Sequence, residues 1–237
     1  MQLFRILQSQ GIGTRRDCLA LIHRQQVLVE GVLVTDSEQD FACDNLHFSV
    51  SGTAHEYRAH AYLVLHKPAG YECSRQPRDH PGVFSLLPDY LLRRGVQCVG
   101  RLDQDTTGLL LFSDDGDFIH HHTSPRKQIG KTYQVTCKHA FTPALIEHLL
   151  AGVQLHDEPL PLSARQCIGL NDRRLQLVIN EGKYHQVKRM LGAAGNRVES
   201  LHRSAIGSYE LPASLEPGTW KWLGADDLAA LKTPLQP

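Results

Sequence analysis

The segment "GRLDQDTTGLLLFSDDG", residues 100–116, combines two features that are seldom adjacent. Asp103 and Asp105 come directly before the apolar run 109–112, which has the composition of a buried strand. Paired carboxylates beside a buried strand need partners or a chemical task, because an unpaired buried charge is unfavourable. The segment therefore predicts a strand that enters the hydrophobic core from a turn with acidic side chains.

The two acids have different surroundings in the sequence. A carboxylate becomes a nucleophile when a neighbouring cation keeps it ionised and burial excludes water. Asp103 precedes the Thr-Thr-Gly sequence 106–108, which can hold a side chain at the floor of a cleft. The alternative is an Asx turn, in which both carboxylates only accept hydrogen bonds from nearby backbone N–H groups. The residues alone leave both interpretations open.

Strand patterns dominate the sequence around this segment. "YLVLHK" (62–67) ends at Pro68, "GLLLFS" (108–113) ends at an Asp-Gly turn, and "KTYQVTC" and "LQLVINEG" also read as strands. Helical patterns occur at about 143–151, 184–194 and 226–232. Strands and helices do not alternate regularly, so we predict an α+β fold rather than a doubly wound sheet.

The N-terminal part of the chain has a pattern of its own. Residues 2–10 have helical spacing and should end at Gly11 or Gly13. Thr14 followed by Asp17 resembles a capping box and predicts a second helix. "VLVEGVLV" (27–34) predicts two short strands around Glu30 and Gly31.

Two helices and a hairpin form a module that is too small to be an enzyme alone. The polar stretch 51–61 is the predicted linker after this module. We therefore divide the chain into an N-terminal module with its linker, residues 1–58, and a catalytic domain, residues 59–237.

Composition excludes several classes of protein. The 25 basic residues balance 25 acidic residues, so the net charge gives no general attraction to nucleic acid. The six cysteines contain no Cys-x-x-Cys pair, which argues against a zinc ribbon or a redox motif. No apolar run approaches the roughly 20 residues of a membrane span. The start "MQLFRILQSQ" has no signal-peptide pattern, so we expect an intracellular, cytoplasmic protein.

The helical pattern near residue 184 places cations beside a buried face. Tyr184, Val187 and Leu191 fall at i, i+3 and i+7 and should face the core, with Asn180 as a candidate cap. The neighbouring face carries His185, Lys188, Arg189 and Gly192. A solvated basic face is the alternative interpretation.

A second basic stretch covers residues 123–139. It contains Tyr133 and no acid, and its cations before His139 are Arg126, Lys127, Lys131 and Lys138. A groove of cations with an aromatic ring suits a nucleic-acid backbone and an unstacked base, although such runs are often only exposed.

The consecutive histidines 120–122 suggest a metal site at first sight. Adjacent residues diverge on a strand and on a helix, so three such side chains converge poorly on one ion. We expect a structural or RNA-facing role there and no metal.

Motifs throughout the chain resemble those of the RsuA-type pseudouridine synthases, with an N-terminal module that resembles the alpha-L RNA-binding module. The motifs are "HKPAGYECS" (66–74), "DHPGVFSLLP" (79–88), "GRLDQDTTGLLLFSDDG" (100–116), "TSPRKQIGKTYQV" (123–135) and "EGKYHQVKRMLGAAGNRVESLHRSAIG" (181–207). The resemblance implies a catalytic domain with a large mixed, mainly antiparallel sheet flanked by helices around a central cleft, beside the small helical and hairpin module.

The resemblance also implies roles for individual residues. Asp103 would be the catalytic carboxylate, Tyr133 would stack on the target base and assist removal of its C5 proton, and Lys188 would pair with Asp103. Ile179 would contact the base, and Lys67 and Arg101 would organise the cleft or contact phosphate. The remaining implied substrate-binding residues are Arg126, Lys131, His185 and Arg189, of which Arg189 is a second choice for the partner of Asp103. We expect Asp105 to shape the turn or hold Arg101.

The implied reaction isomerises a uridine of small-subunit (16S) rRNA, of the uridine-516 type, to pseudouridine. No group enters or leaves, so no cofactor or metal is implied, and the uridine has to leave its stack to reach the carboxylate. The implied partner is 16S rRNA or a small-subunit assembly intermediate. We expect the protein to act as a monomer and not to bind a membrane. Alternatives are a large-subunit rRNA pseudouridine synthase and a non-catalytic RNA-binding assembly factor. A two-carboxylate glycoside hydrolase fits poorly, because only 7% of residues are aromatic.

Overall fold

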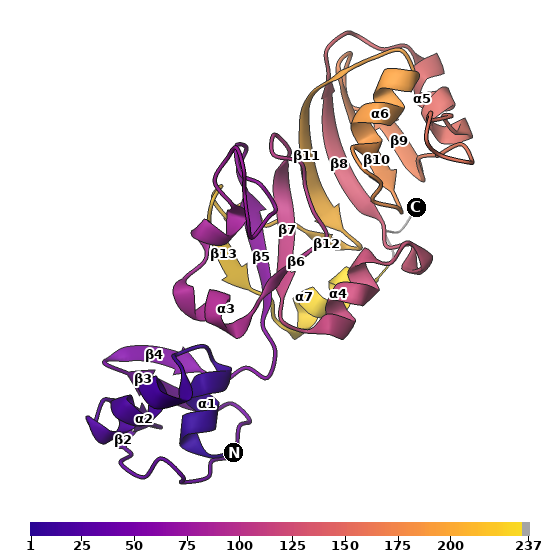
Figure 1. The fold of residues 1–237 in the computed structure, drawn as a ribbon. Coiled ribbons are helices and arrows are strands. Elements are labelled where there is room, and N and C mark those ends of the chain that lie inside the picture. The colour runs from indigo at the N-terminus through magenta and orange to yellow at the C-terminus, as the bar shows by residue number, and fades with distance from the viewer. Residues whose placement is uncertain (234–237) are drawn as a thin grey trace. The chain divides into compact units, whose positions relative to one another are not determined.

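The computed structural model describes residues 1–233, which form two compact units (Figure 1). Unit 1 comprises residues 1–61, 87–97 and 113–115, and unit 2 comprises the rest of the chain. The helices and mixed sheets confirm the predicted α+β class. Unit 1 includes segments from beyond residue 61, so the boundary between the two units does not fall at a single position in the sequence. The division at residue 58 stays a prediction.

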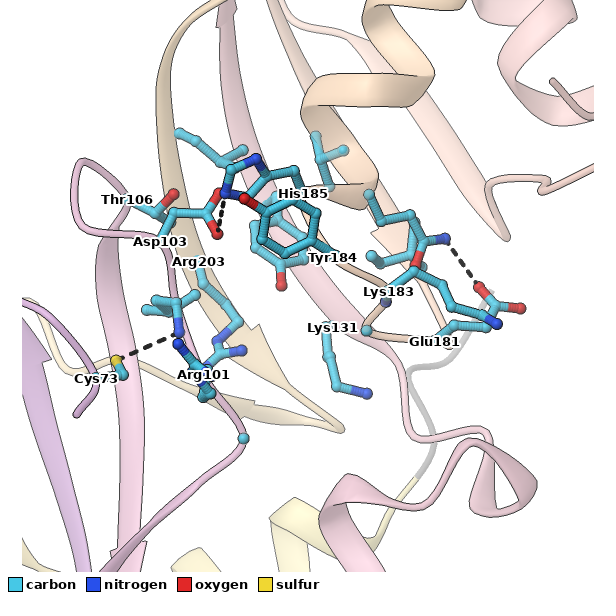
Figure 2. Close-up of a pocket in the computed structure, with 18 of the residues that line it drawn as sticks. Cys73, Arg101, Asp103, Thr106, Lys131, Glu181, Lys183, Tyr184, His185 and Arg203 are labelled. Carbon is cyan, nitrogen blue, oxygen red and sulfur yellow. Dashed lines mark hydrogen bonds and ion pairs between the residues drawn. The ribbon is translucent and has the colours of Figure 1, made fainter. Parts of the chain in front are cut away.

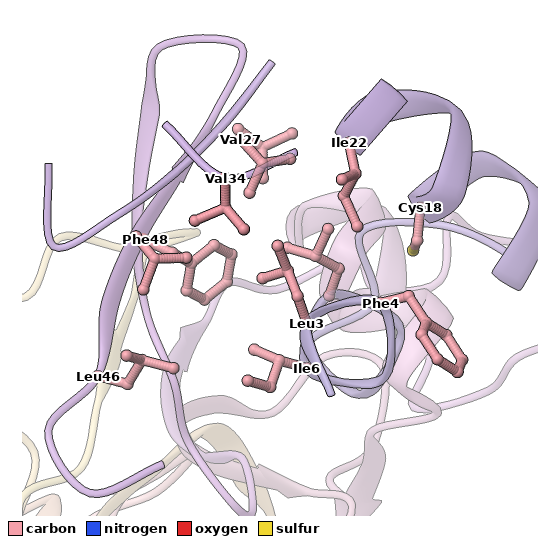
Figure 3. Packing of buried hydrophobic residues seen from close by; sticks show 12 residues of the cluster. Leu3, Phe4, Ile6, Cys18, Ile22, Val27, Val34, Leu46 and Phe48 are labelled. Atoms are coloured by element: carbon pink, nitrogen blue, oxygen red, sulfur yellow. The ribbon is translucent and has the colours of Figure 1, made fainter. Parts of the chain in front are cut away.

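Unit 1 consists of short helices and a four-stranded antiparallel sheet of order β2-β1-β3-β4. Its elements are α1 (Leu3–Ser9), α2 (Arg15–His23), β1 (Val27–Val29), β2 (Val32–Leu33), β3 (His47–Val50), β4 (Thr53–Glu56) and α3 (Asp89–Arg94). Leu3 and Ile6 of α1, Ile22 of α2 and Phe48 of β3 meet in one apolar core (Figure 3). Burial of these side chains holds the small sheet against its helices.

Local signals in unit 1 were predicted correctly. The side chain of Thr14 accepts a hydrogen bond from the Asp17 N–H, and the Asp17 carboxylate accepts one from the Thr14 N–H, which completes the capping box. Glu30 and Gly31 both have positive φ, 48° and 78°, as a two-residue hairpin between β1 and β2 requires.

The predicted linker 51–61 is wrong in part. Residues 53–56 form β4, which pairs with β3 across the turn at Ser51 and Gly52. Both turn residues have positive φ, 51° and 82°, so the polar composition of this stretch reflects a second tight hairpin.

Unit 2 is built on a nine-stranded sheet, counted over residues 1–233, whose main path is β13-β5-β7-β11-β8-β10-β9. Its strands are β5 (Tyr62–Lys67), β6 (Gln97–Val99), β7 (Thr107–Ser113), β8 (Lys131–Cys137), β9 (Gln166–Gly169), β10 (Arg174–Ile179), β11 (Val198–Ile206), β12 (Tyr209–Glu210) and β13 (Trp220–Trp222). Its helices are η1 (Val83–Leu86), α4 (Gly116–Thr123), η2 (Pro125–Lys127), α5 (Pro143–Ala151), α6 (Gln186–Ala193) and α7 (Ala225–Lys232). The pairing of β7 with β11 is parallel, whereas β8, β9, β10 and β11 pair antiparallel.

One apolar cluster joins the helices α4 and α7 to the sheet. Leu109 and Leu111 of β7 pack with Phe118 of α4, Leu231 of α7 and Ile206 of β11. The apolar run after the two acids is therefore a buried core strand, as the sequence predicts. No helix among residues 1–233 is long and apolar enough to cross a bilayer.

Two helices differ from the sequence prediction. Helix α4 follows β7 directly, where only an Asp-Gly turn was expected, and it splays the three histidines so that His122 is buried while His120 is exposed. Helix α6 begins at Gln186, after His185 in the left-handed conformation (φ 48°), without a cap from Asn180. Tyr184 therefore lies outside the helix and is 76% exposed, so its predicted core position is wrong.

Gly108 is required where β7 and β11 run side by side. Gly108 lies opposite Arg203 in the parallel register, with φ 105°. A Cβ atom at Gly108 would lie 2.2 Å from the carbonyl oxygen of Arg203, which is far inside contact distance. Only glycine allows this close approach of the two backbones.

We predict that Gly108→Ala destabilises the protein by about 3 kcal/mol, because the added methyl forces β7 from β11. Thermal unfolding followed by circular dichroism measures the change. Gly116→Ala is the matched control, since no atom lies within 4 Å of a Cβ built there. Equal melting temperatures for the two variants would contradict the prediction.

Candidate active site

Unit 2 contains a cavity of about 720 Å³ at the ends of its central strands. The segment before β7, the strands β8, β10 and β11, and the start of α6 contribute its walls (Figure 2). Six predicted site residues line it: Arg101, Asp103, Lys131, Tyr133, Ile179 and His185. Segments that are far apart in sequence therefore place most of the predicted residues around one space.

Asp103 is held by Lys188 of α6 and by His185 at the cap of that helix. Nζ of Lys188 lies 3.0 Å from Oδ2, and Nε2 of His185 lies 3.3 Å from Oδ1. The Asp103 side chain keeps 25% of its surface exposed, so it is open to the cavity on one side. A cation in contact with the carboxylate is one of the features that a carboxylate nucleophile requires.

Asp105 holds Lys188 as well, rather than Arg101. Its Oδ1 accepts a hydrogen bond of 2.6 Å from Nζ of Lys188, which corrects the expectation that it holds Arg101. Burial opposes the charge on both partners, yet their hydrogen bond outweighs it. The pKa of Asp105 is lowered and that of Lys188 is raised. The ammonium is thus kept protonated between the two acids.

Lys67 supports the acidic turn, residues 103–106, through hydrogen bonds to its backbone. Its side chain is fully buried, and Nζ donates hydrogen bonds to the carbonyls of Pro68, Gln104 and Thr106 at 3.1, 3.0 and 2.8 Å. Burial lowers the pKa of this ammonium, and the charges of Asp103 and Asp105 oppose that effect. The prediction that Lys67 contacts phosphate is therefore wrong, because no part of its side chain reaches solvent. Its position fits the other expectation, that it organises the cleft.

Arg189 and Arg126 are predicted binding residues that, like Lys67, do not line the cavity. Arg189 points to Asp157, with which it forms an ion pair, and also donates to the carbonyl of Tyr184. It is therefore not the partner of Asp103, since Lys188 of the same helix takes that position. Arg126 is exposed on η2 and lies outside the cavity lining. Of the basic stretch 123–139, only Lys131 brings a cation into the cavity.

The sheet register places the apolar and aromatic part of the site. Tyr133 and Lys131 are two residues apart on β8 and point to the same face. Ile179 of β10 pairs with Lys131, and Arg203 of β11 pairs with Tyr133. All four side chains line the cavity, and together they form its floor.

Sequence reasoning missed Cys73 as a support of the acidic turn. Its Sγ accepts a hydrogen bond of 3.4 Å from the backbone N–H of Leu102, directly before Asp103. The hydrogen bond from Cys98 lowers the pKa of Cys73 to about 6, against the effect of burial. The cysteines were set aside because no Cys-x-x-Cys spacing occurs, and only the fold brings this pair together.

Arg203 and Tyr184 were also missed. Arg203 is 2% exposed on the floor of the cavity. Tyr184 stacks on His185, with ring centroids 3.8 Å apart, where it lines the cavity. Among residues 1–233 no group of three or more His, Cys, Asp or Glu side chains is arranged to hold a metal ion.

Comparison with known proteins places this chain in a family. The family model described as RNA pseudouridylate synthase matches residues 61–193, which carry the acidic turn, Tyr133 and Lys188. The chain belongs to the RNA pseudouridylate synthase family. The predicted enzyme class, an isomerase that forms pseudouridine, is thereby confirmed.

Individual relatives cover most of the chain. It is 36% identical to the ribosomal small subunit pseudouridine synthase A of Yersinia pestis, over 99% of both chains. It is 41% identical to the protein of that name from Escherichia coli K12, over 72% of this chain and 73% of the relative. A crystal structure of a pseudouridylate synthase superposes with a TM-score of 0.69 at 32% identity and covers 98% of this chain and 99% of the other.

We predict that Lys67→Met destabilises the protein by roughly 3 kcal/mol and lowers activity, because three backbone carbonyls of the turn lose their donor. Urea unfolding and a single-turnover assay measure the two effects. Lys232→Met, at an exposed lysine in the last turn of α7, is the control and should behave like the unchanged protein. A stable and fully active Lys67→Met protein would show that the turn does not depend on this ammonium.

Proposed function

We propose that this pseudouridine synthase acts on 16S rRNA of the small ribosomal subunit, at a uridine of the uridine-516 type. The observation that carries the proposal is the Asp103 carboxylate, held by Lys188 and His185 beside the floor formed by Tyr133 and Ile179. The similarity to small-subunit synthases over nearly the whole chain supports the choice of rRNA.

In the proposed reaction Asp103 is the nucleophile, and it attacks either C1′ of the ribose or the base ring. Lys188 fixes the position of Asp103, while Asp105 holds Lys188 from the other side. The N1–C1′ bond breaks, the ring turns, and C5 bonds to C1′. Tyr133 stacks on the ring and assists removal of the C5 proton. The bond to Asp103 breaks again and N1 takes up a proton, so Asp103 is returned unchanged and the overall reaction is an isomerisation.

The substrate uridine has to leave its stack, because Asp103 lies at the wall of a cavity that a base within a helix cannot enter. Ile179 contacts the flipped base, while Arg101, Lys131 and His185 bind the target nucleotide around the cavity. Arg126 and Arg189, outside the lining, contact flanking parts of the RNA. The N-terminal module of residues 1–58 contributes to rRNA binding, and the catalytic domain of residues 59–237 carries out the reaction. We propose that the enzyme acts as a cytoplasmic monomer on 16S rRNA or an assembly intermediate.

The RNA target is tested in a strain that lacks the gene. Carbodiimide modification and primer extension map the pseudouridines of its 16S and 23S rRNA. We expect one 16S pseudouridine to disappear and to return when the gene is restored. An unchanged 16S map would overturn the small-subunit assignment, and a loss in 23S rRNA would favour a large-subunit enzyme. Unchanged maps in both rRNAs would favour a non-catalytic assembly factor.

The two acids are separated by conservative variants. Asp103→Asn should lower the single-turnover rate by about 10⁴-fold or more, because an amide cannot act as the nucleophile. Asp105→Asn should lower it only about tenfold, since Lys188 keeps its contact with Asp103. The dissociation constant for RNA, measured by filter binding, should stay within about threefold for both variants. Turnover by Asp103→Asn would remove this carboxylate from the mechanism.

A further inference from the structure

The floor of the cavity contains two cations without a carboxylate partner. Arg203 of β11 is 2% exposed, donates from Nε to the carbonyl of Leu109 at 2.8 Å, and has a buried Nη2 without a hydrogen-bond partner. Nζ of Lys131 donates only to the carbonyls of Ile129 and Asn180, at 3.1 and 3.2 Å. Within residues 1–233 neither side chain forms an ion pair with an acid, in contrast to Lys188.

These cations stand beside the aromatic floor rather than at the mouth of the cavity. Arg203 is paired across the strands with Tyr133, and Lys131 lies one pleat away on β8. Figure 2 shows Lys131 and Arg203 on the side of the cavity away from the contact of His185 with Asp103. A ring that stacks on Tyr133 would therefore have Asp103 on one side and the two cations on another.

The arrangement is electrostatically unfavourable while the cavity is empty. Burial and, to a smaller extent, the charge of Arg203 together lower the pKa of Lys131 to about 8. The charge of Glu181 opposes this effect. The charge of Arg203 also contributes, as a minor cause, to the lowered pKa of Cys73. Buried like charges with an unused donor are stabilised when an anionic group binds between them. Such unpaired charge is typical of a functional site.

The chemistry of the substrate decides which anion fits. Phosphodiester groups remain on the RNA backbone at the mouth of the cavity, whereas the flipped base reaches the floor. When N1–C1′ breaks, the electron pair stays on the uracil ring and spreads over N1, O2 and O4. Attack of a carboxylate on C6 of the ring places electron density on C5 and on O4, one of the same oxygens. The pair returns to bonding when C5 joins C1′. The C5 proton then leaves, N1 takes up a proton and the bond to Asp103 is broken, so charge and atoms balance on either route.

We propose that Arg203 and Lys131 form a subsite that stabilises the negative charge on the uracil ring during isomerisation. The inference rests on the proposed function, because it takes the uracil to lie on Tyr133. It assigns catalysis to two places: Asp103 with Lys188 at the wall, and Arg203 with Lys131 at the floor. Donors aimed at developing charge in a site that excludes water are an effective means of lowering a barrier.

Binding of free bases tests the subsite without RNA. The probes are uracil and 6-azauracil, whose ring N–H is more acidic, so that it is partly anionic near neutral pH. Calorimetric titration of the full chain at pH 7.5 should show at least about tenfold tighter binding of 6-azauracil, and Arg203→Gln should reduce this preference below about threefold. Lys131→Gln should reduce it in the same direction, and Lys232→Gln should leave it unchanged.

Several outcomes would overturn the inference. They are an equal affinity of the unchanged protein for both bases, a preference that survives in Arg203→Gln and Lys131→Gln, and a loss confined to binding of inorganic phosphate. Lys131→Gln guards against misfolding of Arg203→Gln, because Arg203 also supports β7 through Leu109. Each variant is compared by thermal unfolding before titration.

Turnover supplies the second readout. On 16S rRNA both variants should lower the single-turnover rate by about a hundredfold and change the dissociation constant for RNA by less than about threefold. A weaker RNA affinity with an unchanged rate would identify a phosphate-binding role and overturn the inference. If the unchanged protein forms no pseudouridine in 16S rRNA, the proposed rRNA target fails, while the titration of the two bases still tests the subsite.

Discussion

The buried ammonium of Lys67 is the contact on which the geometry of the site depends. Its three hydrogen bonds reach carbonyls on both sides of Asp105 and at the end of β5, so they tie β5 to the turn before β7. A buried charge of this kind is tolerated because carbonyl dipoles surround it. The turn cannot relax without leaving these carbonyls unpaired, and the direction of the Asp103 side chain follows from the turn.

The parallel contact of β7 with β11 extends this constraint to the rest of the cavity. Gly108 lets the two backbones approach, which places Arg203 next to the start of β7. Antiparallel pairing then brings Tyr133 opposite Arg203 and Ile179 opposite Lys131. The floor of the site is therefore a consequence of sheet register, and a slip by one residue would turn these side chains to the other face.

Charge is distributed unevenly over the site in a way that suits the proposed isomerisation. At the wall, Lys188 is balanced by Asp103 and Asp105 and has a raised pKa. At the floor, Lys131 has no such balance and has a lowered pKa of about 8. One cation thus serves a carboxylate of the protein, whereas the other is left for a group that the protein does not contain.

The sequence by itself determined the features that depend on neighbouring residues. The capping box of Thr14 and Asp17, the hairpin turn at Glu30, the strand 131–137 and the helix 143–151 follow from backbone preferences and side-chain periodicity within a few residues. The motif around Asp103 and four further motifs also identified the family, because they follow one another along the chain in the order typical of that family.

Only the tertiary structure decided which side chains meet. Asp105 and Lys188 are 83 residues apart, and periodicity contains no information about such a contact. Likewise, the left-handed His185 delays the start of α6 and turns Tyr184 outward, against its apolar spacing. Burial of Lys67 and Arg203 depends on packing of the whole sheet, since a charged residue is buried only where distant carbonyls, strands or a bound substrate compensate for the loss of water.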